Sequence, residues 1–285
     1  MCHCLHLAVG EGARCEVIQQ TLRDLAVLTA KLKKSPKEWA IFRGIQVDIA
    51  VRAKQCRDGE IGDDDESEDG GSEDEQGAAL EKKRPGSVLK LLTSVPTRWS
   101  SVFYCVNRAL RLRRAIDEYL NMHPLTVKDT EDEDDTRGRR VDKLEWETLE
   151  ALKDAMSPIR DVSLMLEGHN YVTSSTVLLY IVRLMYGQLD LKSQGRTASY
   201  RTFVRAFTQK LSTLIDDVNQ FYTWSLAAYV DGRHKSLEWL KPIWAHKEHW
   251  PKVIKEYKNL DALKRNLHGE IEKMVSLSLV AFRLS

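Results

Sequence analysis

The sequence predicts a mainly α-helical protein. Apolar residues recur at intervals of three and four along most of the chain, as they do on one face of an amphipathic helix. Proline follows or interrupts several of these periodic stretches, and no set of alternating segments resembles the strands of a full α/β sheet. With 285 residues, 42% hydrophobic and 30% charged, the chain suits a soluble globular protein of one large or two small domains.

Three helices are expected in the first half of the chain. The first covers residues 16–34, carries lysines in its last turn and is stopped by Pro36. The second runs from about 38 to 55, and the third covers 98–120 with Thr97 placed to cap its start. The inward stripe of the first helix is Ile18, Leu22, Leu25, Leu28 and Leu32.

The second half continues the same period. Further helices are expected over residues 149–166, 174–191, 199–222 and 251–285. Pro158 should kink or split the first of these, because proline removes a backbone donor and clashes with the preceding turn. The short run 225–230 fits a strand or a helix equally well.

Two acidic tracts interrupt the helical pattern. Residues 58–75 contain eleven acids and no base, and residues 129–135 contain six acids and no base. Such tracts repel themselves and stay solvated, so we expect a linker at the first and a charged loop at the second. The rest of the chain then holds 25 acids against 43 bases, a balance of about +18. This excess favours a polyanionic partner such as DNA, or simply keeps a helical surface solvated.

Several classes of protein are excluded by composition. No apolar run approaches the roughly 20 residues needed to cross a bilayer, so a transmembrane protein is not expected. The first residues lack the basic start and apolar core of a signal peptide. Five irregularly spaced cysteines indicate a reducing compartment rather than a disulfide framework.

Five short motifs, in order along the chain, resemble those of the hobo–Activator (hAT) family of DNA transposases. They are Cys2 to Val9, the Lys-Ser-Pro stretch at 34–36, Thr97-Arg98-Trp99-Ser100-Ser101, the pair of segments Glu145-Trp146-Glu147 and Leu166-Glu167-Gly168, and Ala227 to Lys235. The last departs from the family pattern, because Gly232 stands where the family has proline. In the first, His3 matches the motif histidine, but the motif cysteine would precede Met1.

This resemblance implies a fold and a chemistry. In the family, a helical insertion domain interrupts an RNase H-like core, and three acidic residues hold two metal ions that cut DNA. The alignment puts the first two acids before His3 and the third beyond Ser285, so we expect no catalytic residue in this chain and no activity by it alone. No cofactor is expected, since Mg²⁺ would serve only an intact family member. The N-terminal helices would expose apolar faces that normally pack on the missing sheet.

The resemblance and the acidic tracts together predict the domain organisation. We expect N-terminal helices flanking the RNase H-like core over residues 1–56 and an acidic linker over 57–86. A helical segment with the Arg-Trp motif follows over 87–123, then a charged loop over 124–141 and the helical insertion domain over 142–285.

Arg98 and Trp99 are the foremost candidates for DNA contact. By the resemblance, this pair holds the distorted transposon end. An indole can stack on an unpaired base and a guanidinium can fork onto phosphate; alternatively, Trp99 is the first core residue of its helix. A basic stripe follows, which could extend a phosphate-binding face or be an ordinary solvated helix face: Arg108, Arg111, Arg113 and Arg114.

Other candidates favour structural roles. Cys2, His3, Cys4 and His6 are too close in sequence to surround one tetrahedral zinc ion, so no metal site is expected. By the resemblance, the family's own site needs the cysteine that would precede Met1, which makes His3 a structural remnant. Asp231, Arg233 and Lys235 match a family motif but also describe the end of an ordinary element. The basic cluster at 82–84 is compatible with nuclear import.

The sequence therefore predicts a nuclear, transposase-derived helical scaffold that associates with DNA, such as a transposon end or hairpin, and with itself or a full-length transposase. Two alternatives stay open. The helices could be a protein–protein interaction module, or the chain could be part of an intact, active transposase.

Overall fold

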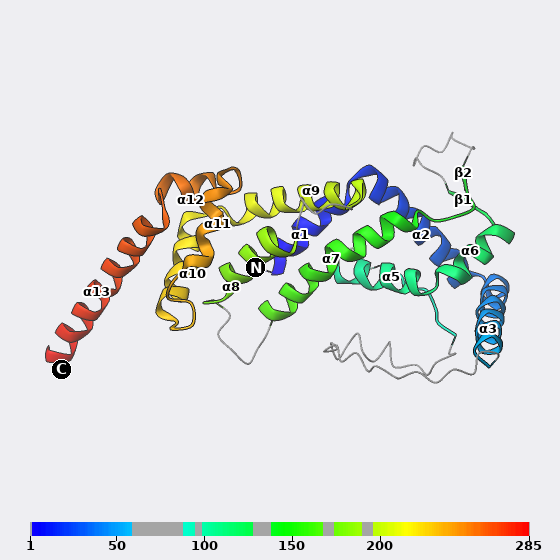
Figure 1. The fold of residues 1–285 in the computed structure, drawn as a ribbon, viewed down its shortest axis with the longest axis horizontal. Coiled ribbons are helices and arrows are strands. Elements are labelled where there is room, and N and C mark those ends of the chain that lie inside the picture. The colour runs from blue at the N-terminus through cyan, green and yellow to red at the C-terminus, as the bar shows by residue number, and fades with distance from the viewer. Residues whose placement is uncertain are drawn as a thin grey trace. The chain divides into compact units, whose positions relative to one another are not determined.

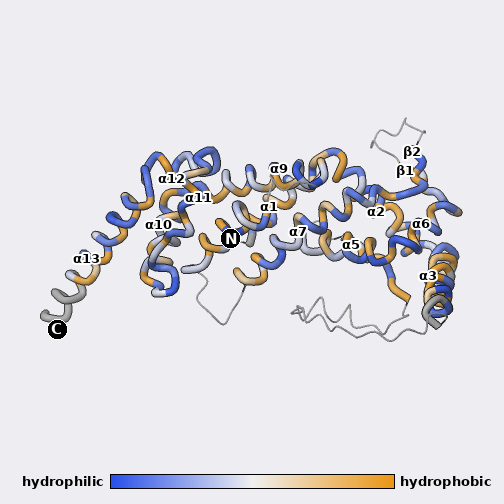
Figure 2. The backbone as a smooth tube through the Cα atoms, viewed as in Figure 1, coloured by the Kyte–Doolittle hydropathy of each residue, from blue (hydrophilic) through white to orange (hydrophobic). Residues whose placement is uncertain are grey.

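The structure, a computed structural model, describes residues 2–58, 88–94, 99–127, 138–167, 174–189 and 196–284. The prediction of a mainly α-helical protein is confirmed. Within these ranges the strands are β1 (Leu125–Val127) and β2 (Arg139–Val141), an antiparallel pair in which Val127 faces Arg139. The RNase H-like core stays a prediction. None of the helices in these ranges is long and apolar enough to cross a membrane, and Figure 2 shows hydrophilic residues along the long helix α13.

The chain forms two compact units, with boundaries between Cys15 and Glu16 and between Lys153 and Asp154. One unit is formed by residues 16–153 and the other by residues 1–15 with 154–285. The first helix therefore belongs to the same unit as the C-terminal half of the chain, a pairing that the sequence did not indicate. The five predicted segments stay a prediction.

The unit of residues 16–153 is built on α2 (Glu16–Lys34), α3 (Pro36–Asp58), α5 (Trp99–Arg111) and α6 (Arg113–Met122), followed by the two strands and the start of α7 (Trp146–Leu166) (Figure 1). α3 packs on α6 through Tyr119, which is fully buried, stands edge-on to Phe42 at 5.8 Å and donates a hydrogen bond to Glu38. That bond lowers the pKa of the Glu38 carboxyl.

The other unit begins with α1 (Cys2–Ala13), which lies along α9 (Ala198–Ile215) (Figure 1). Its remaining elements are the end of α7, α8 (Val177–Arg183), the π-helical turn η1 (Leu184–Gln188), α10 (Val218–Val230), η2 (Glu238–Leu240), α11 (Lys241–Ala245), η3 (Lys247–His249), α12 (Pro251–Glu256) and α13 (Leu260–Leu284).

The main apolar stripes of α1 and α2 are covered, contrary to the expectation that the N-terminal helices would expose them, whereas Val47 and Val51 of α3 are 44% and 47% exposed. Leu5, Ala8 and Val9 of α1 are at most 2% exposed, and Ile18, Leu25 and Leu28 of α2 at most 1%. The neighbouring helices supply the covering surface, so no missing sheet is needed to bury them.

Several predicted helices differ from the structure at their breaks. α2 and α3 match the predictions over 16–34 and 38–55, and the run 225–230 is helical within α10. The expected helix over 98–120 is divided at Leu112, and 174–191 ends in the π-helical turn. Thr97, the predicted cap, lies outside the described residues.

Pro158 does not split its helix. α7 continues through it from Trp146 to Leu166, because Ala155, Met156 and Ile159 on either side are completely buried. This packing outweighs the missing backbone hydrogen bond.

Two adjacent aspartates divide the helix expected over 199–222. Asp217 accepts a hydrogen bond from the amide of Gln220 and caps α10. Asp216, 5% exposed, accepts hydrogen bonds from the amides of Lys252 and Val253 at 3.0 and 3.1 Å, so it caps the distant helix α12. A carboxylate at the first turn of α12 satisfies amides that have no partner within the helix. A corresponding cap, Asn259, begins α13 and ends the run expected to be continuous from 251.

Gly12 allows the close approach of α1 to α9. A Cβ atom at this position would lie 2.7 Å from two ring carbons of the buried Phe203. Real Cβ atoms do not approach so closely, so any larger residue must push the helices apart or displace the ring.

Replacing Gly12 by alanine is expected to lower the free energy of unfolding by about 1–3 kcal/mol, the usual range for overpacking a core. Urea unfolding followed by circular dichroism measures this. Gly10→Ala is the matched control, because nothing lies within 4 Å of its added methyl group. That substitution should be neutral or stabilising by up to about 1 kcal/mol. Equal effects of the two substitutions would contradict the close contact.

A hydrogen-bonded aromatic cluster joins η1 to η3. The Tyr186 hydroxyl accepts a hydrogen bond from the Trp250 indole at 2.8 Å and lies 3.3 Å from Nδ1 of His249. The Tyr186 ring also stacks on His246, with centroids 4.6 Å apart. The hydroxyl has one proton and a second lone pair, so it donates to His249 or accepts from it depending on the tautomer of the imidazole. Burial lowers the pKa of His249, while nearby Glu248 raises it and His246 lowers it further.

This cluster should make stability depend on pH. A histidine whose pKa is lower in the folded state contributes fully above its unfolded pKa of about 6.5 and loses that contribution as the pH falls. We expect the thermal unfolding temperature to decrease as the pH is lowered from about 8 to about 5.5. His249→Gln should reduce the slope of unfolding temperature against pH. His268→Gln, at a histidine 63% exposed, is the control that should keep the slope. An unchanged slope in His249→Gln would refute the assignment.

Candidate nucleic-acid interface

The predicted DNA-binding residues fall in the unit of residues 16–153, along α5 and α6. Arg98 lies outside the described residues. Trp99 begins α5 and is half-buried, so part of its ring contributes to packing and part faces solvent. It fits both of the roles considered for it.

Arg108 does not share the exposed face predicted for the basic stripe. It is 6% exposed, and its guanidinium donates a hydrogen bond at 3.0 Å to the carbonyl oxygen of Lys90. Its phase on α5 explains the difference, because Arg108 lies three residues after Cys105 and four before Leu112, which are 5% and 7% exposed. Arg108 is therefore part of the fold.

The other three arginines gather at the junction of α5 and α6. Arg111 ends α5, and Arg113 and Arg114 begin α6 after the turn at Leu112; all three are exposed. Arg113 lies over the Trp146 ring at 5.3 Å and pairs with Glu150 at 2.9 Å. The two side chains of that pair are 47% and 55% exposed, so the pair contributes little to stability. Arg113 can therefore readily exchange Glu150 for another anion.

The positions of Arg113 and Arg114 oppose the local electrostatics of the fold. The first turn of α6 contains no acid, and no side chain caps its start. A helix N-terminus carries partial positive charge and favours anions, so two arginines there cost stability rather than add to it. An anion bound between them would relieve this repulsion.

Trp99 and the three arginines occupy opposite ends of α5. With 13 residues, the helix separates them by about 18 Å at 1.5 Å per residue. The predicted stripe is thus two patches. At about 3.4 Å per step, the separation equals about five nucleotides, so one DNA strand is long enough to span the distance between the two patches.

A pocket of about 410 Å³ lies beside the arginines. One wall is α3 through Gln46, Ile49, Ala50 and Ala53. The opposite wall is the α5–α6 junction from Leu110 to Ala115, and Val88 completes the lining. No local sequence motif indicates this pocket, which forms where α3 and the junction pack together.

Side chains anchor the extended segment that carries Val88. The Gln46 amide donates to the carbonyl of Leu89 at 3.0 Å and accepts from its amide at 2.9 Å. Arg108 holds Lys90, and the Cys105 thiol donates to the carbonyl of Leu92. Burial raises the pKa of Cys105 to about 11, so this thiol stays protonated and keeps donating. These contacts fix residues 88–94 without a sheet or helix.

The remaining candidates lie in the other unit. His3 is exposed on α1 and stacks with His6 at a centroid distance of 6.4 Å. The described residues contain no group of three or more His, Cys, Asp or Glu side chains arranged to hold a metal ion; the side chain of Cys2 is not among them.

Asp231 and Arg233 form a closed local pair just after α10. Both Asp231 carboxylate oxygens accept hydrogen bonds from the Arg233 guanidinium, at 3.0 and 2.7 Å, and one also accepts from the Arg233 amide. The arginine holds the pKa of Asp231 well below its usual range. Lys235 is exposed in the following turn, which ends at Leu237, a buried residue with a left-handed φ of 52°.

Substitution of single arginines should distinguish the one that stabilises the fold from those that lie on the surface. Arg108→Ala is expected to lower the free energy of unfolding by about 1.5–3 kcal/mol, because it removes a buried charged donor and leaves a carbonyl without that partner. Arg114→Ala should change it by less than about 0.5 kcal/mol. Chemical denaturation of both variants tests this; a comparable loss in Arg114→Ala would place that residue in the fold as well.

Comparison of the chain with protein-family models, characterised proteins and solved structures finds no match. The resemblance to the hAT family therefore rests on the motifs alone.

Proposed function

We propose that the chain is a DNA-associating helical scaffold derived from a hAT transposase, without a complete acidic active site. In this proposal the helices correspond to the insertion domain with a fragment of the RNase H-like core, and the protein acts in the nucleus. Self-association, or assembly with a full-length transposase, is part of the same proposal.

The arginine cluster at the α5–α6 junction is the observation that carries the proposal. Arg111, Arg113 and Arg114 are exposed within one short stretch, and the last two begin a helix where their charge is unfavourable for folding. Guanidinium groups fork onto phosphate oxygens, and the spacing of successive phosphates suits a row of such groups. Contacts of this kind bind DNA without reading its sequence.

Trp99 adds a second contact of a different kind. Its half-buried ring leaves part of the indole accessible at the far end of α5. Stacking of an exposed aromatic face on an unpaired base contributes about 1–3 kcal/mol to binding, whereas a paired base inside a duplex offers no free face. A hairpin or frayed end would engage both ends of α5, and a plain duplex only the arginines.

The test is binding of the purified chain to a fluorescent DNA hairpin with unpaired bases over a salt series. Affinity should fall steeply with added salt, and the double substitution Arg113→Ala with Arg114→Ala should reduce the log–log salt slope by about two. Arg205→Ala is the matched control, since Arg205 is an exposed arginine on α9, in the unit that does not contain the junction. It should leave the slope unchanged.

Trp99→Ala tests the second contact. It should weaken binding to the hairpin by roughly tenfold or more and leave binding to a fully paired duplex unaltered. If the folded chain bound neither DNA, or if the junction variant bound as tightly as the wild type, the DNA-associating scaffold would be rejected.

A further inference from the structure

DNA phosphates account for the arginines at the α5–α6 junction but not for the pocket beside them. A duplex laid on this face would contact the guanidinium groups and leave the apolar part of the pocket filled with water. The pocket volume, about 410 Å³, is within the range of sites that bind small molecules or single side chains of a partner.

The lining of the pocket selects for an aliphatic group flanked by negative charge. Its floor is made of aliphatic side chains, and the small residues Ala50, Ala53 and Ala115 leave the space open. Arg111, Arg113 and Arg114 form one rim, and among the described lining residues no carboxylate opposes an acidic ligand. An occupant that combines a bulky apolar group with flanking acids is therefore complementary to both parts of the lining.

An unpaired nucleotide fits this lining poorly. None of the described residues that line the pocket is aromatic, so a base would have no ring on which to stack. The one side-chain amide among these residues, Gln46, already exchanges two hydrogen bonds with Leu89, which fix its orientation toward the 88–94 segment. An aliphatic side chain needs neither kind of contact.

We infer that this pocket is a docking site for an acidic peptide segment of a protein partner, with one bulky aliphatic side chain inserted between α3 and the α5–α6 junction. The flanking carboxylates pair with the arginine rim, which gives the charge complementarity. Arg113 can exchange its exposed partner Glu150 for a carboxylate of the peptide. Because the peptide and DNA use the same arginines, they exclude one another; only this competition rests on the proposed function.

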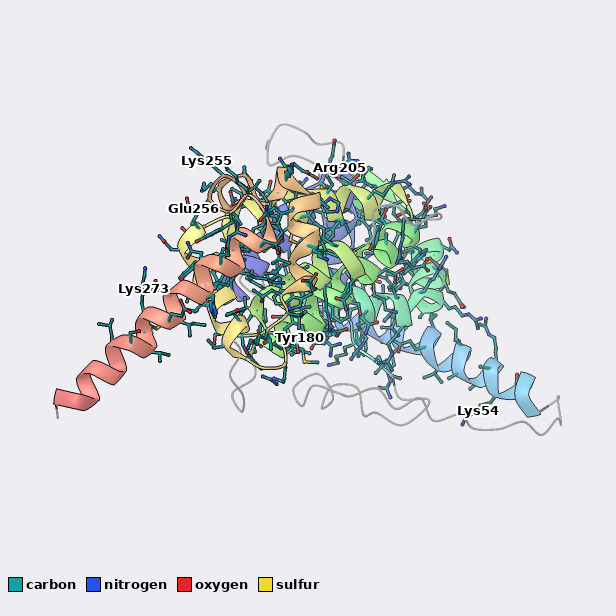
Figure 3. All side chains as sticks on the ribbon, turned by 60° about the vertical axis from the view of Figure 1, so that its left-hand side comes forward. Lys54, Tyr180, Arg205, Lys255, Glu256 and Lys273 are labelled. Atoms are coloured by element: carbon teal, nitrogen blue, oxygen red, sulfur yellow. The ribbon has the colours of Figure 1, made fainter. Side chains whose placement is uncertain are left out.

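The walls of the pocket allow a sharp test. Ala53 lies on α3, half-buried, and lines the pocket without contributing charge. Ala53→Leu fills the cavity from within a helix that tolerates leucine, and it leaves all three arginines in place. Figure 3 shows the next residue, Lys54, pointing outward from α3, so Lys54→Leu is the matched control for adding a leucine to this helix outside the pocket.

The probe is a fluorescein-labelled peptide of sequence Glu-Glu-Asp-Leu-Leu-Asp-Glu-Glu, whose binding to the full chain is followed by anisotropy. Two matched peptides replace both leucines by serine, or all acids by their amides. The wild-type chain and Lys54→Leu should bind the probe, and Ala53→Leu should bind it about tenfold or more weakly, since burial of the leucine side chain is lost. The serine peptide should lose a similar factor, and unlabelled duplex DNA should displace the probe.

The outcomes separate this inference from the proposed function. Equal binding of the leucine and serine peptides, or undiminished binding to Ala53→Leu, would overturn the docking site and leave attraction by charge alone. Binding of DNA without any binding of the peptide would also overturn it while supporting the DNA-associating scaffold. Binding of the peptide without any binding of DNA would support the docking site and reject the scaffold.

Discussion

An extended segment that belongs to neither a helix nor a sheet determines the geometry of the candidate site. Residues 88–94 cross between α3 and α5, and their backbone groups need partners that no regular element supplies. Gln46, Cys105 and Arg108 supply them through four hydrogen bonds from two helices. The same bonds set the position of Val88 in the pocket lining. The charge of Arg108 is thereby used inside the fold, while its neighbours in sequence remain on the surface.

The helices could be predicted because their apolar residues repeat with a single period. α2 matches its prediction from Glu16 to Lys34, since one stripe, a basic last turn and a following proline all agree. The breaks were harder to predict because the residues that cause them act at a distance. Asp216 ends one helix yet caps another that begins 35 residues later, at Pro251, and no local pattern reveals that pairing. Pro158 shows the opposite case, in which packing on both sides overrides a strong local signal.

The candidate site was predictable in its charges but not in its shape. The basic run from 108 to 114 is plain in the sequence, and three of its four arginines are exposed together. Which one turns inward depends on the phase of the helix relative to a core that the sequence does not specify. The pocket requires α3, the α5–α6 junction and Val88 to meet, and the only local sign of it was the small size of Ala50 and Ala53. A large residue at either position would have closed the space.

The pairing of β1 with β2 has a consequence for how the protein tolerates change. Val127 and Arg139 are paired across the two strands, so the ends of the connection between β1 and β2 are neighbours in space. Eleven residues separate Val127 from Arg139 in the sequence. Lengthening such a connection costs only loop-closure entropy, which grows with the logarithm of length, about 0.6 kcal/mol per doubling. The hairpin is therefore a permissive insertion point, where evolution or a protein engineer can add sequence while the helical framework keeps its register.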